Sequence, residues 1–424
     1  MLNKSLLNIS TKGCFFKDKL TEESFISFQK KASISFSEIK AAYHNKKLPA
    51  LSIVSEKDHL EECQRIAQTW KKRFKNIVLF GTGGSSLGAQ TCIELYQTRG
   101  GKPEDSPYFH FMDNIDPHTF TQLLKGLDLK TTGFLVISKS GTTAETLCQF
   151  LSLISAFKNQ LSQDQVIVIT EPKNSPLRRL AEQHQYQLLD HPSNIGGRFS
   201  IFSLVGMLPA LIAGINAKEI LEGAKAYLTQ ELEEITQNST QGAALNYAYY
   251  QQFGCTQTVL MPYIDRLSAF ALWFRQLWAE SLGKEKRGIT PINALGTVDQ
   301  HSQLQLYLGG PNDKFFTLIL LETFTSSPQV ITSDSELSYL HHHTLGDLMK
   351  AEQEATAATL IRQGCPTRII TLNQLNERTL GALFTHYMLE TIITANLLEI
   401  DAFDQPAVEE GKILTREYLS RKAS

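Results

Sequence analysis

Short, mostly apolar runs of strand length alternate with segments of helical periodicity through the first half of the chain. The strand-type runs occupy 76–80, 108–112, 134–138, 166–170 and 187–190. Helical periodicity covers 60–74, 88–97, 144–158 and a segment that begins near 176. Because strands and helices alternate at a spacing of about 30 residues, the pattern predicts right-handed βαβ units and a parallel sheet covered by helices on both faces.

The same alternation returns after about residue 205. Strand candidates lie at 258–261, 315–321 and 368–372, and helix candidates at 265–282, 337–362 and 380–398. We interpret the chain as an α/β protein with two doubly wound parallel-sheet domains, at 49–205 and 206–400. A mixed segment, 1–48, precedes them, and 401–424 is predicted to be a C-terminal helical tail. No low-complexity linker separates the two blocks, so we expect them to share an interface with a cleft.

Composition narrows the function classes. The net charge of −2 over 424 residues argues against nucleic acid as the main ligand, because binding its phosphates requires a basic excess. No apolar run approaches the ~18 residues of a membrane span, and the N-terminus lacks a signal-type apolar stretch. The six cysteines include no CxxC pair, which predicts free thiols in a reducing cytoplasm rather than a metal site or disulfides.

A hydroxyl-rich loop follows the apolar run that ends near Ile137. Ser138, Lys139, Ser140, Thr142 and Thr143 lie within six positions, just before a helix-compatible segment. A loop between a strand and a helix N-terminus offers free N–H groups, the positive end of the helix dipole and hydroxyl donors. These are the groups that hold a phosphate dianion without a metal. The alternative is a Ser/Thr-rich turn with an ordinary helix cap.

A glycine loop, 81–88, follows the strand predicted at 76–80 and contains Gly84 and Ser85. It does not fit the dinucleotide-binding fingerprint, because Ser86 stands where the third glycine is required. Serines at the start of a helix favour a phosphate or a sugar hydroxyl over a pyrophosphate. The second phosphate-type loop, one βαβ unit later, supports the same interpretation.

Two further segments carry candidate charged groups. Arg198 follows paired glycines in 193–200, where its guanidinium would stabilise an anion or serve as a structural arginine on a turn. Gln276, Glu280 and Lys284 share one face of a predicted helix among large apolar residues. Glu280 is therefore either half of a surface pair with Lys284 or a carboxylate at a cleft that can act as a base.

The remaining candidates are single residues. His301 lies in a polar, glycine-led segment, where Asp299 and Gln300 are expected to orient its ring if it is not simply structural. Lys412 lies near the start of the predicted last helix and, taken alone, reads as a surface lysine. Each of these sites has an ordinary structural explanation when it is considered separately.

Together these segments resemble the glucose-6-phosphate isomerase family, and they occur in that family's order. The matching stretches are the glycine loop 81–88, SKSGTT at 138–143, NIGGRFS at 194–200, WAESLGK at 278–284, DQHSQLQLY at 299–307 and FDQ…EEGK at 403–412. The resemblance spans about residue 50 to the end and is most specific in GGRFS and DQHS. It implies two sugar-isomerase α/β domains.

The resemblance also implies a role for each candidate. The substrate phosphate would be held by Ser85, Ser138, Ser140 and Thr143, with Gly84, Lys139 and Thr142 close by. Glu280 would be the base that moves a proton between C2 and C1 through a cis-enediol, while Arg198 stabilises the enediolate. His301 would open the sugar ring, with Lys412 near the ring oxygen. Gln276 and Gln405 would contact sugar or enediol oxygens.

By the same resemblance, the enzyme needs no metal or redox cofactor, and His301 comes from the neighbouring subunit of a homodimer. The sequence departs from the family pattern at Val298 and at Pro406-Ala407. Because proline suits the first position of a helix, we expect Pro406 to open the last helix and Lys412 to keep its place. Two alternatives remain: an isomerase that also accepts mannose 6-phosphate, and a non-catalytic sugar-phosphate-binding regulator. A pure binding module has no chemical need for Arg198, Glu280, His301 and Lys412 together, which favours an enzyme.

Overall fold

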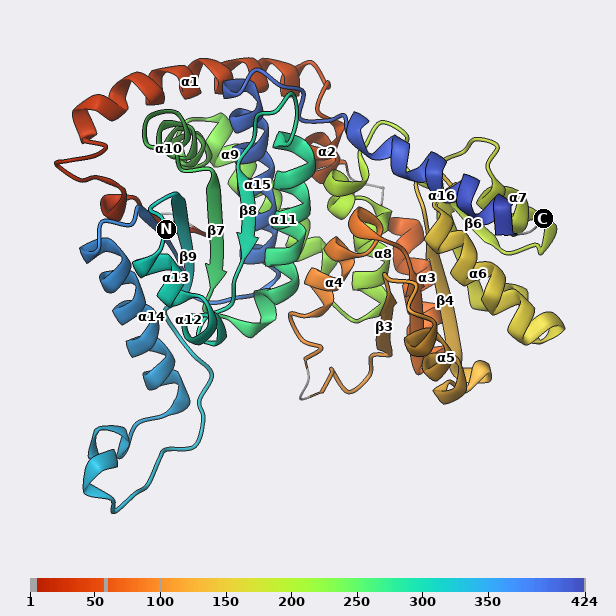
Figure 1. The fold of residues 1–424 in the computed structure, drawn as a ribbon. Coiled ribbons are helices and arrows are strands. Elements are labelled where there is room, and N and C mark those ends of the chain that lie inside the picture. Colours follow the sequence, from red (N-terminus) through yellow and green to blue (C-terminus); the bar gives the residue numbers. More distant parts are fainter. Residues whose placement is uncertain (1–5, 57–59, 99–100, 423–424) are drawn as a thin grey trace.

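The computed structural model describes residues 6–56, 60–98 and 101–422, and it contains two β-sheets side by side (Figure 1). The first sheet has the order β3–β2–β4–β5–β6, with every pair parallel. Its strands are β2 (Asn76–Phe80), β3 (Tyr108–Met112), β4 (Thr132–Ile137), β5 (Val166–Thr170) and β6 (Gln187–Asp190). The strand order reverses between β2 and β4, and the carboxyl ends of strands at such a switch point are where ligands bind.

Side chains of the first sheet alternate between two apolar layers. One layer contains Ile77, Leu79, Leu135 and Ile137 and packs against α3 (Glu61–Arg73), α4 (Leu87–Ile93) and α8 (Leu204–Ile212). The other contains Val78, Phe80, Phe134 and Val136 and packs against α5 (Pro117–Gly126), α6 (Ala144–Phe157) and α7 (Pro176–Gln183). Since helices cover both faces, the ends of the strands remain as the place for a polar site.

The second sheet has the order β1–β10–β9–β7–β8 and is parallel except for β1. Its strands are β1 (Asn8–Ser10), β7 (Gln257–Pro262), β8 (Thr290–Asn293), β9 (Lys314–Leu321) and β10 (Thr367–Leu372). The surrounding helices are α1 (Glu22–His44), α9 (Ala217–Leu232), α10 (Asn238–Phe253), α11 (Ser268–Leu282), α12 (Val298–Ser302), α13 (Leu304–Gly309), α14 (Leu345–Arg362) and α15 (Glu377–Leu397). One apolar cluster runs from the first sheet through α8, α9 and α15 to the second sheet, so the two halves share a core.

The predicted α/β class, with two sheets and a C-terminal helix, is confirmed, but the two edge strands of the second sheet were not predicted. Strand β1 comes from the N-terminal segment and pairs antiparallel with β10, so this sheet is not purely parallel. Strand β8 contains Pro291, which an edge strand tolerates because one side of it makes no ladder hydrogen bonds. The helix predicted over 337–362 begins only at Leu345, where Thr344 and Asp347 form a capping box.

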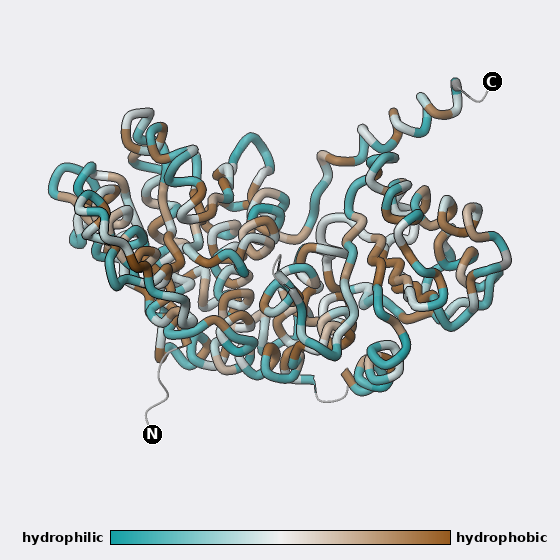
Figure 2. The backbone as a smooth tube through the Cα atoms, turned by 90° about the horizontal axis from the view of Figure 1, so that it is seen from below, coloured by the Kyte–Doolittle hydropathy of each residue, from teal (hydrophilic) through white to brown (hydrophobic). Residues whose placement is uncertain are grey.

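The C-terminal helix α16 (Glu409–Lys422) projects from the rest of the chain (Figure 2). Pro406 opens a short 3-10 turn, Pro406–Val408, immediately before α16 rather than α16 itself. Apolar side chains of α16 are exposed, among them Ile413, Tyr418 and Leu419. No helix among the described residues is long and apolar enough to cross a bilayer.

A buried ion pair links β10 to α15. Arg368 donates two parallel hydrogen bonds to Glu390, of 2.7 and 3.0 Å, and both side chains are about 1% exposed. Asn246 of α10 donates to the same carboxylate, and His386 Nε2 lies 3.0 Å from it. Burial alone raises the pKa of Glu390, but Arg368 and His386 bring that pKa below its usual value. Each of the two buried charges is therefore neutralised by the other where β10 packs against α15.

We predict that Arg368→Met lowers the free energy of unfolding by about 3–5 kcal/mol, because it leaves the Glu390 carboxylate buried without its partner. Urea unfolding followed by circular dichroism measures this change. The double variant Arg368→Met/Glu390→Gln is expected to recover most of the loss. Lys40→Met, which breaks the exposed pair with Glu234, serves as the control and should cost under about 1 kcal/mol. Equal losses in the buried and exposed variants would contradict this account.

Candidate active site

Arg198 connects its own turn, at the carboxyl edge of the first sheet, to the end of α11 and to segment 402–405. It lies in the 3-10 turn Gly197–Phe202, just after β6, and is 3% exposed. All five of its N–H donors have acceptors: Ser281 Oγ (2.9 Å), Glu280 Oε2 (3.2 Å), Gln405 Oε1 (2.5 Å), and the carbonyls of Ala402 (2.6 Å) and Asp404 (3.0 Å). Burial lowers the pKa of Arg198, and the Glu280 carboxylate opposes that shift. The guanidinium is thus held in one orientation.

Glu280 lies near the end of α11 and connects Arg198 to Gln276. Gln276 Nε2 donates to Glu280 Oε1 at 2.8 Å, as expected for residues four apart on a helix. The Glu280 side chain is 35% exposed, whereas Gln276 Oε1 is buried with no partner among the described residues. Lys284 does not pair with Glu280; it bonds Asp404 Oδ1 at 3.0 Å and the carbonyls of Ser281 and Asp401. The surface-pair interpretation of Glu280 and Lys284 is therefore wrong.

The glycine loop after β2 is packed directly against these residues. A Cβ added at Gly84 would come within 2.2 Å of the Gly197 carbonyl carbon and 2.6 Å of Arg198 N. At Gly83, which has φ +58°, it would come within 2.5 Å of Gln276 Nε2. Ser85, the last residue of the turn Gly83–Ser85, is half-buried beside them. The absence of side chains at both glycines is what allows the first sheet to approach Arg198 and α11.

The hydroxyl-rich loop lies at the same edge, because it follows β4, the strand next to β2. Ser138 Oγ is 2.8 Å from Thr143 Oγ1, and Thr142 Oγ1 donates to Ser140 Oγ at 3.0 Å. Lys139 Nζ lies 3.6 Å from Glu171 Oε1. Thr143 is the cap position of α6 but makes no side-chain cap bond, so the first-turn N–H groups of α6 face the loop. This arrangement suits an anion with several acceptor oxygens.

His301 stands apart from this cluster within one chain. It is exposed on α12, which follows β8, and its side chain makes no hydrogen bond or ion pair with another described residue. Glu280 lies twelve residues along α11 from Ser268, or about 18 Å by helical rise, toward the opposite end of the second sheet. In Figure 1, α12 is at the lower end of that sheet and α16 begins at the upper end.

Asp299 and Gln300 do not orient His301, contrary to the expectation. Asp299 accepts from Leu295 N at 2.7 Å and from Ser302 Oγ at 2.6 Å. Burial raises the pKa of Asp299, but these hydrogen bonds bring it below its usual value. Gln300 accepts from Tyr263 and Thr356 and donates to Glu352, so both residues brace α12 against its surroundings.

Lys412 is likewise outside the cluster. Its ammonium pairs with Glu409 at 2.6 Å, one turn earlier on α16, and its side chain is 58% exposed. Of the described residues, Ser281, Ala402 and Asp404 contact Arg198 but were not predicted. Ser281 lies in the WAESLGK stretch, so its hydroxyl could have been identified from the sequence as a hydrogen-bond partner. The backbone carbonyls of Ala402 and Asp404 could not, because a carbonyl contact has no sequence pattern.

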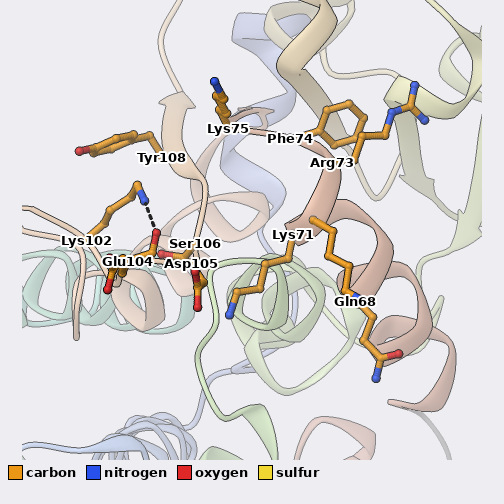
Figure 3. Close-up of a pocket in the computed structure, with 11 residues that line it drawn as sticks. Gln68, Lys71, Arg73, Phe74, Lys75, Lys102, Glu104, Asp105, Ser106 and Tyr108 are labelled. Carbon is orange, nitrogen blue, oxygen red and sulfur yellow. Dashed lines mark hydrogen bonds between the residues drawn. The ribbon is translucent and has the colours of Figure 1, made fainter.

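Two cavities are candidates for ligand binding, and only one of them lies beside the Arg198 cluster. One, of about 610 Å³, lies beside Glu280, between the end of α11 and segment 401–408, with Gln405 and Val408 in its wall. A larger cavity, of about 760 Å³, lies at the opposite edge of the first sheet beside Lys75, Lys102 and Tyr108 (Figure 3). It contains no predicted site residue, and its basic lining partly reflects the C-terminal turn of α3, where cations are favoured. The first cavity is the one that continues the Arg198 cluster.

Comparison with known proteins identifies the family of the chain. The sequence model of the family described as phosphoglucose isomerase matches residues 53–311 and 333–424. The chain belongs to the phosphoglucose isomerase family. A glucose-6-phosphate isomerase from Carboxydothermus hydrogenoformans is 36% identical over 387 residues, covering 86% of this chain and 83% of that protein.

Solved structures extend the similarity to nearly the whole fold. A hypothetical protein from Thermus thermophilus is similar with a TM-score of 0.85 and 32% identity, covering 97% of this chain and 99% of that one. A glucose-6-phosphate isomerase from Chlamydia trachomatis has a TM-score of 0.81 and 22% identity, covering 99% and 89%, which supports the fold alone. The family resemblance predicted from the motifs is confirmed, and the chain is an aldose–ketose isomerase that acts on a sugar phosphate.

We predict that Gly84→Ala lowers kcat/KM of this phosphoglucose isomerase family member by about 10- to 100-fold. The added methyl group would overlap the Gly197 carbonyl and Arg198 N, and overpacking of about 1–3 kcal/mol would push the glycine loop off the Arg198 turn. Gly196→Ala is the matched control, because its nearest neighbour would be 3.7 Å away. Steady-state assays of both variants test the prediction, which fails if the two behave alike.

Proposed function

We propose that the enzyme interconverts D-glucose 6-phosphate and D-fructose 6-phosphate through ring opening and a cis-enediol. The observation that carries this proposal is the contact of Glu280 with a fixed, fully hydrogen-bonded Arg198, packed against the glycine loop at the sheet edge that also carries the hydroxyl-rich loop. An aldose–ketose isomerase needs a base at C2, a stabiliser for the enediolate and a distant anchor for the phosphate. The cluster offers one candidate for each requirement.

We also infer a cytoplasmic location, since all six cysteines are free thiols.

The phosphate would be bound by hydroxyls of the two loops at the switch point of the first sheet. We assign this role to Ser85, Ser138, Ser140 and Thr143, with Gly84, Lys139 and Thr142 completing the pocket. The N-terminus of α6 adds unpaired N–H groups and a favourable dipole. Because the phosphate does not react, its binding energy can position the sugar carbons at Glu280.

Glu280 would carry the proton between C2 and C1. Its partly exposed carboxylate can reach a ligand, while Arg198 and Gln276 each donate a hydrogen bond to one of its oxygens and so orient it. The Arg198 guanidinium supplies positive charge where the enediolate forms, and its five fixed hydrogen bonds mean that it need not reorganise during the reaction. Gln276 and Gln405 would contact sugar oxygens, since each lies beside one of these two charged groups.

His301 and Lys412 would act at the sugar ring, although both lie outside the Arg198 cluster of the single chain. We propose that His301 enters the site of a second copy in a homodimer. Val298 and Leu306, near His301 in sequence, are 61% and 56% exposed, which gives α12 and α13 an apolar surface for that contact. We propose that Lys412 reaches the ring oxygen when α16 packs over the site, because the exposed apolar residues of α16 lack cover in the isolated chain.

We predict that Glu280→Gln lowers turnover about 10²- to 10⁴-fold, the usual contribution of a general base. Proton NMR of fructose 6-phosphate in D2O measures this directly: the wild-type enzyme should form glucose 6-phosphate deuterated at C2. Glu233→Gln, an exposed residue at the end of α9, is the control and should match wild type. Mannose 6-phosphate appearing at a similar rate would broaden the specificity. Sugar-phosphate binding without turnover by wild type would refute the isomerase.

We predict that mixing two inactive variants restores activity if His301 acts across a dimer interface. Glu280→Gln and His301→Ala homodimers, allowed to exchange subunits, should yield about a quarter of wild-type activity, because each mixed dimer has one intact site. Sedimentation velocity reports the oligomeric state in the same samples. A monomer, or a mixed dimer without regained activity, would contradict a shared site.

A further inference from the structure

Helix α11 carries Gln276 and Glu280, yet its N-terminus is capped by a residue from the other half of the molecule. The residue at its own cap position, Leu267, has no side chain that can accept a hydrogen bond. Instead, Glu94 Oε2 accepts from Ala269 N at 2.9 Å and from Ser268 Oγ at 3.0 Å. A carboxylate at this position satisfies an unpaired N–H group and meets the positive end of the helix dipole.

Glu94 lies at the opposite end of α4 from the glycine loop. That loop, Gly83–Ser85, comes just before α4, and Glu94 follows the last residue of α4. A second contact supports the same end, because Arg266 Nη1 donates to the Leu95 carbonyl at 3.4 Å. Glu94 is also partly buried: desolvation raises the pKa of its carboxyl, while the bonds from α11 oppose that shift.

The two ends of α4 therefore touch α11 at two matched points. At one end Glu94 holds Ser268 and Ala269, and at the other Gly83 lies against the Gln276 amide. Ala269 and Gln276 are seven residues apart, or about 10 Å along the helix, and α4 itself has seven residues. Neither contact can shift along the helix without breaking the other.

We propose that Glu94 is a positioning residue for the isomerase reaction, an inference that rests on the proposed function. By fixing where α11 lies along its own axis, its carboxylate keeps Gln276 at the glycine loop and Glu280 at Arg198. The hydroxyl-rich loop lies between β4 and α6, and Glu94 belongs to neither element, so most of the proposed phosphate site is expected to keep its position without Glu94. Loss of Glu94 should therefore reduce the rate of the chemical step more than it weakens phosphate binding.

The test compares Glu94→Ala and Glu94→Gln in the full-length enzyme. Glu94→Ala should lower kcat by about 10- to 100-fold, as expected for a base displaced by about 1 Å, with KM changed less than threefold. Glu94→Gln should return kcat to within about threefold of wild type, because one amide oxygen can accept both bonds that Oε2 now accepts. An unchanged kcat in Glu94→Ala, or no rescue by glutamine, overturns the proposal.

Asp116→Ala is the matched control for a lost helix cap. Asp116 caps α5, on the other face of the first sheet, by accepting from Thr119 N at 2.7 Å. Its loss should lower the unfolding temperature as Glu94→Ala does, yet leave kcat unchanged. If both variants lose activity in proportion to stability, Glu94 is only a structural cap and the proposal is wrong.

Glu94→Asp keeps the experiment decisive if Glu94→Ala does not fold. It retains the charge and the capping chemistry but withdraws the carboxylate by one methylene, so kcat should fall below that of the glutamine variant. Equal kcat for the aspartate variant and wild type would overturn the proposal. Wild-type enzyme that fails to isomerise sugar phosphate would instead refute the proposed function, which separates the two failures.

Discussion

The site depends on how the guanidinium of Arg198 is satisfied. A buried cation is costly unless every donor finds an acceptor, and here the acceptors come from α11 and from the segment after α15. Arg198 itself sits on a turn of the first half of the chain, against the backbone of Gly84. One side chain thus links both sheets and the C-terminal segment, which explains why residues more than 200 positions apart meet at one point.

The separation of tasks between the two halves follows from their sheets. The first sheet presents both phosphate-type loops at its switch point, as the βαβ rhythm and the hydroxyl pattern indicated. The second supplies a long helix whose last turns reach that edge, with Glu280 and Gln276 on one face. The proposed phosphate binding and proton transfer would therefore be built on different scaffolds that share an apolar core.

Sequence patterns predicted the continuously apolar strands and the site residues that lie in short polar motifs. The central strands could be recognised because burial on both faces selects continuous apolar runs, whereas β1 has only three residues and β8 is a four-residue strand with a proline, so neither carries that signal. Arg198, Glu280 and Gln276 were predicted, but the carbonyls of Ala402 and Asp404 have no side-chain signature. Asp299 and Gln300 were misjudged because consecutive helical residues point in different directions, so adjacency to His301 did not imply contact.

Strand β1 has a consequence for how the chain is made. Its partner, β10, begins at Thr367, so the ribosome must add more than 350 residues before residues 8–10 can join their sheet. At about 5–20 residues per second, that interval is roughly 20–70 s. All five strands of the first sheet lie within 76–190 and can assemble meanwhile. The N-terminal strand must then wait in unpaired form until β10 has been made, whereas α1 can pack earlier against α10, as Phe28 does against Tyr247.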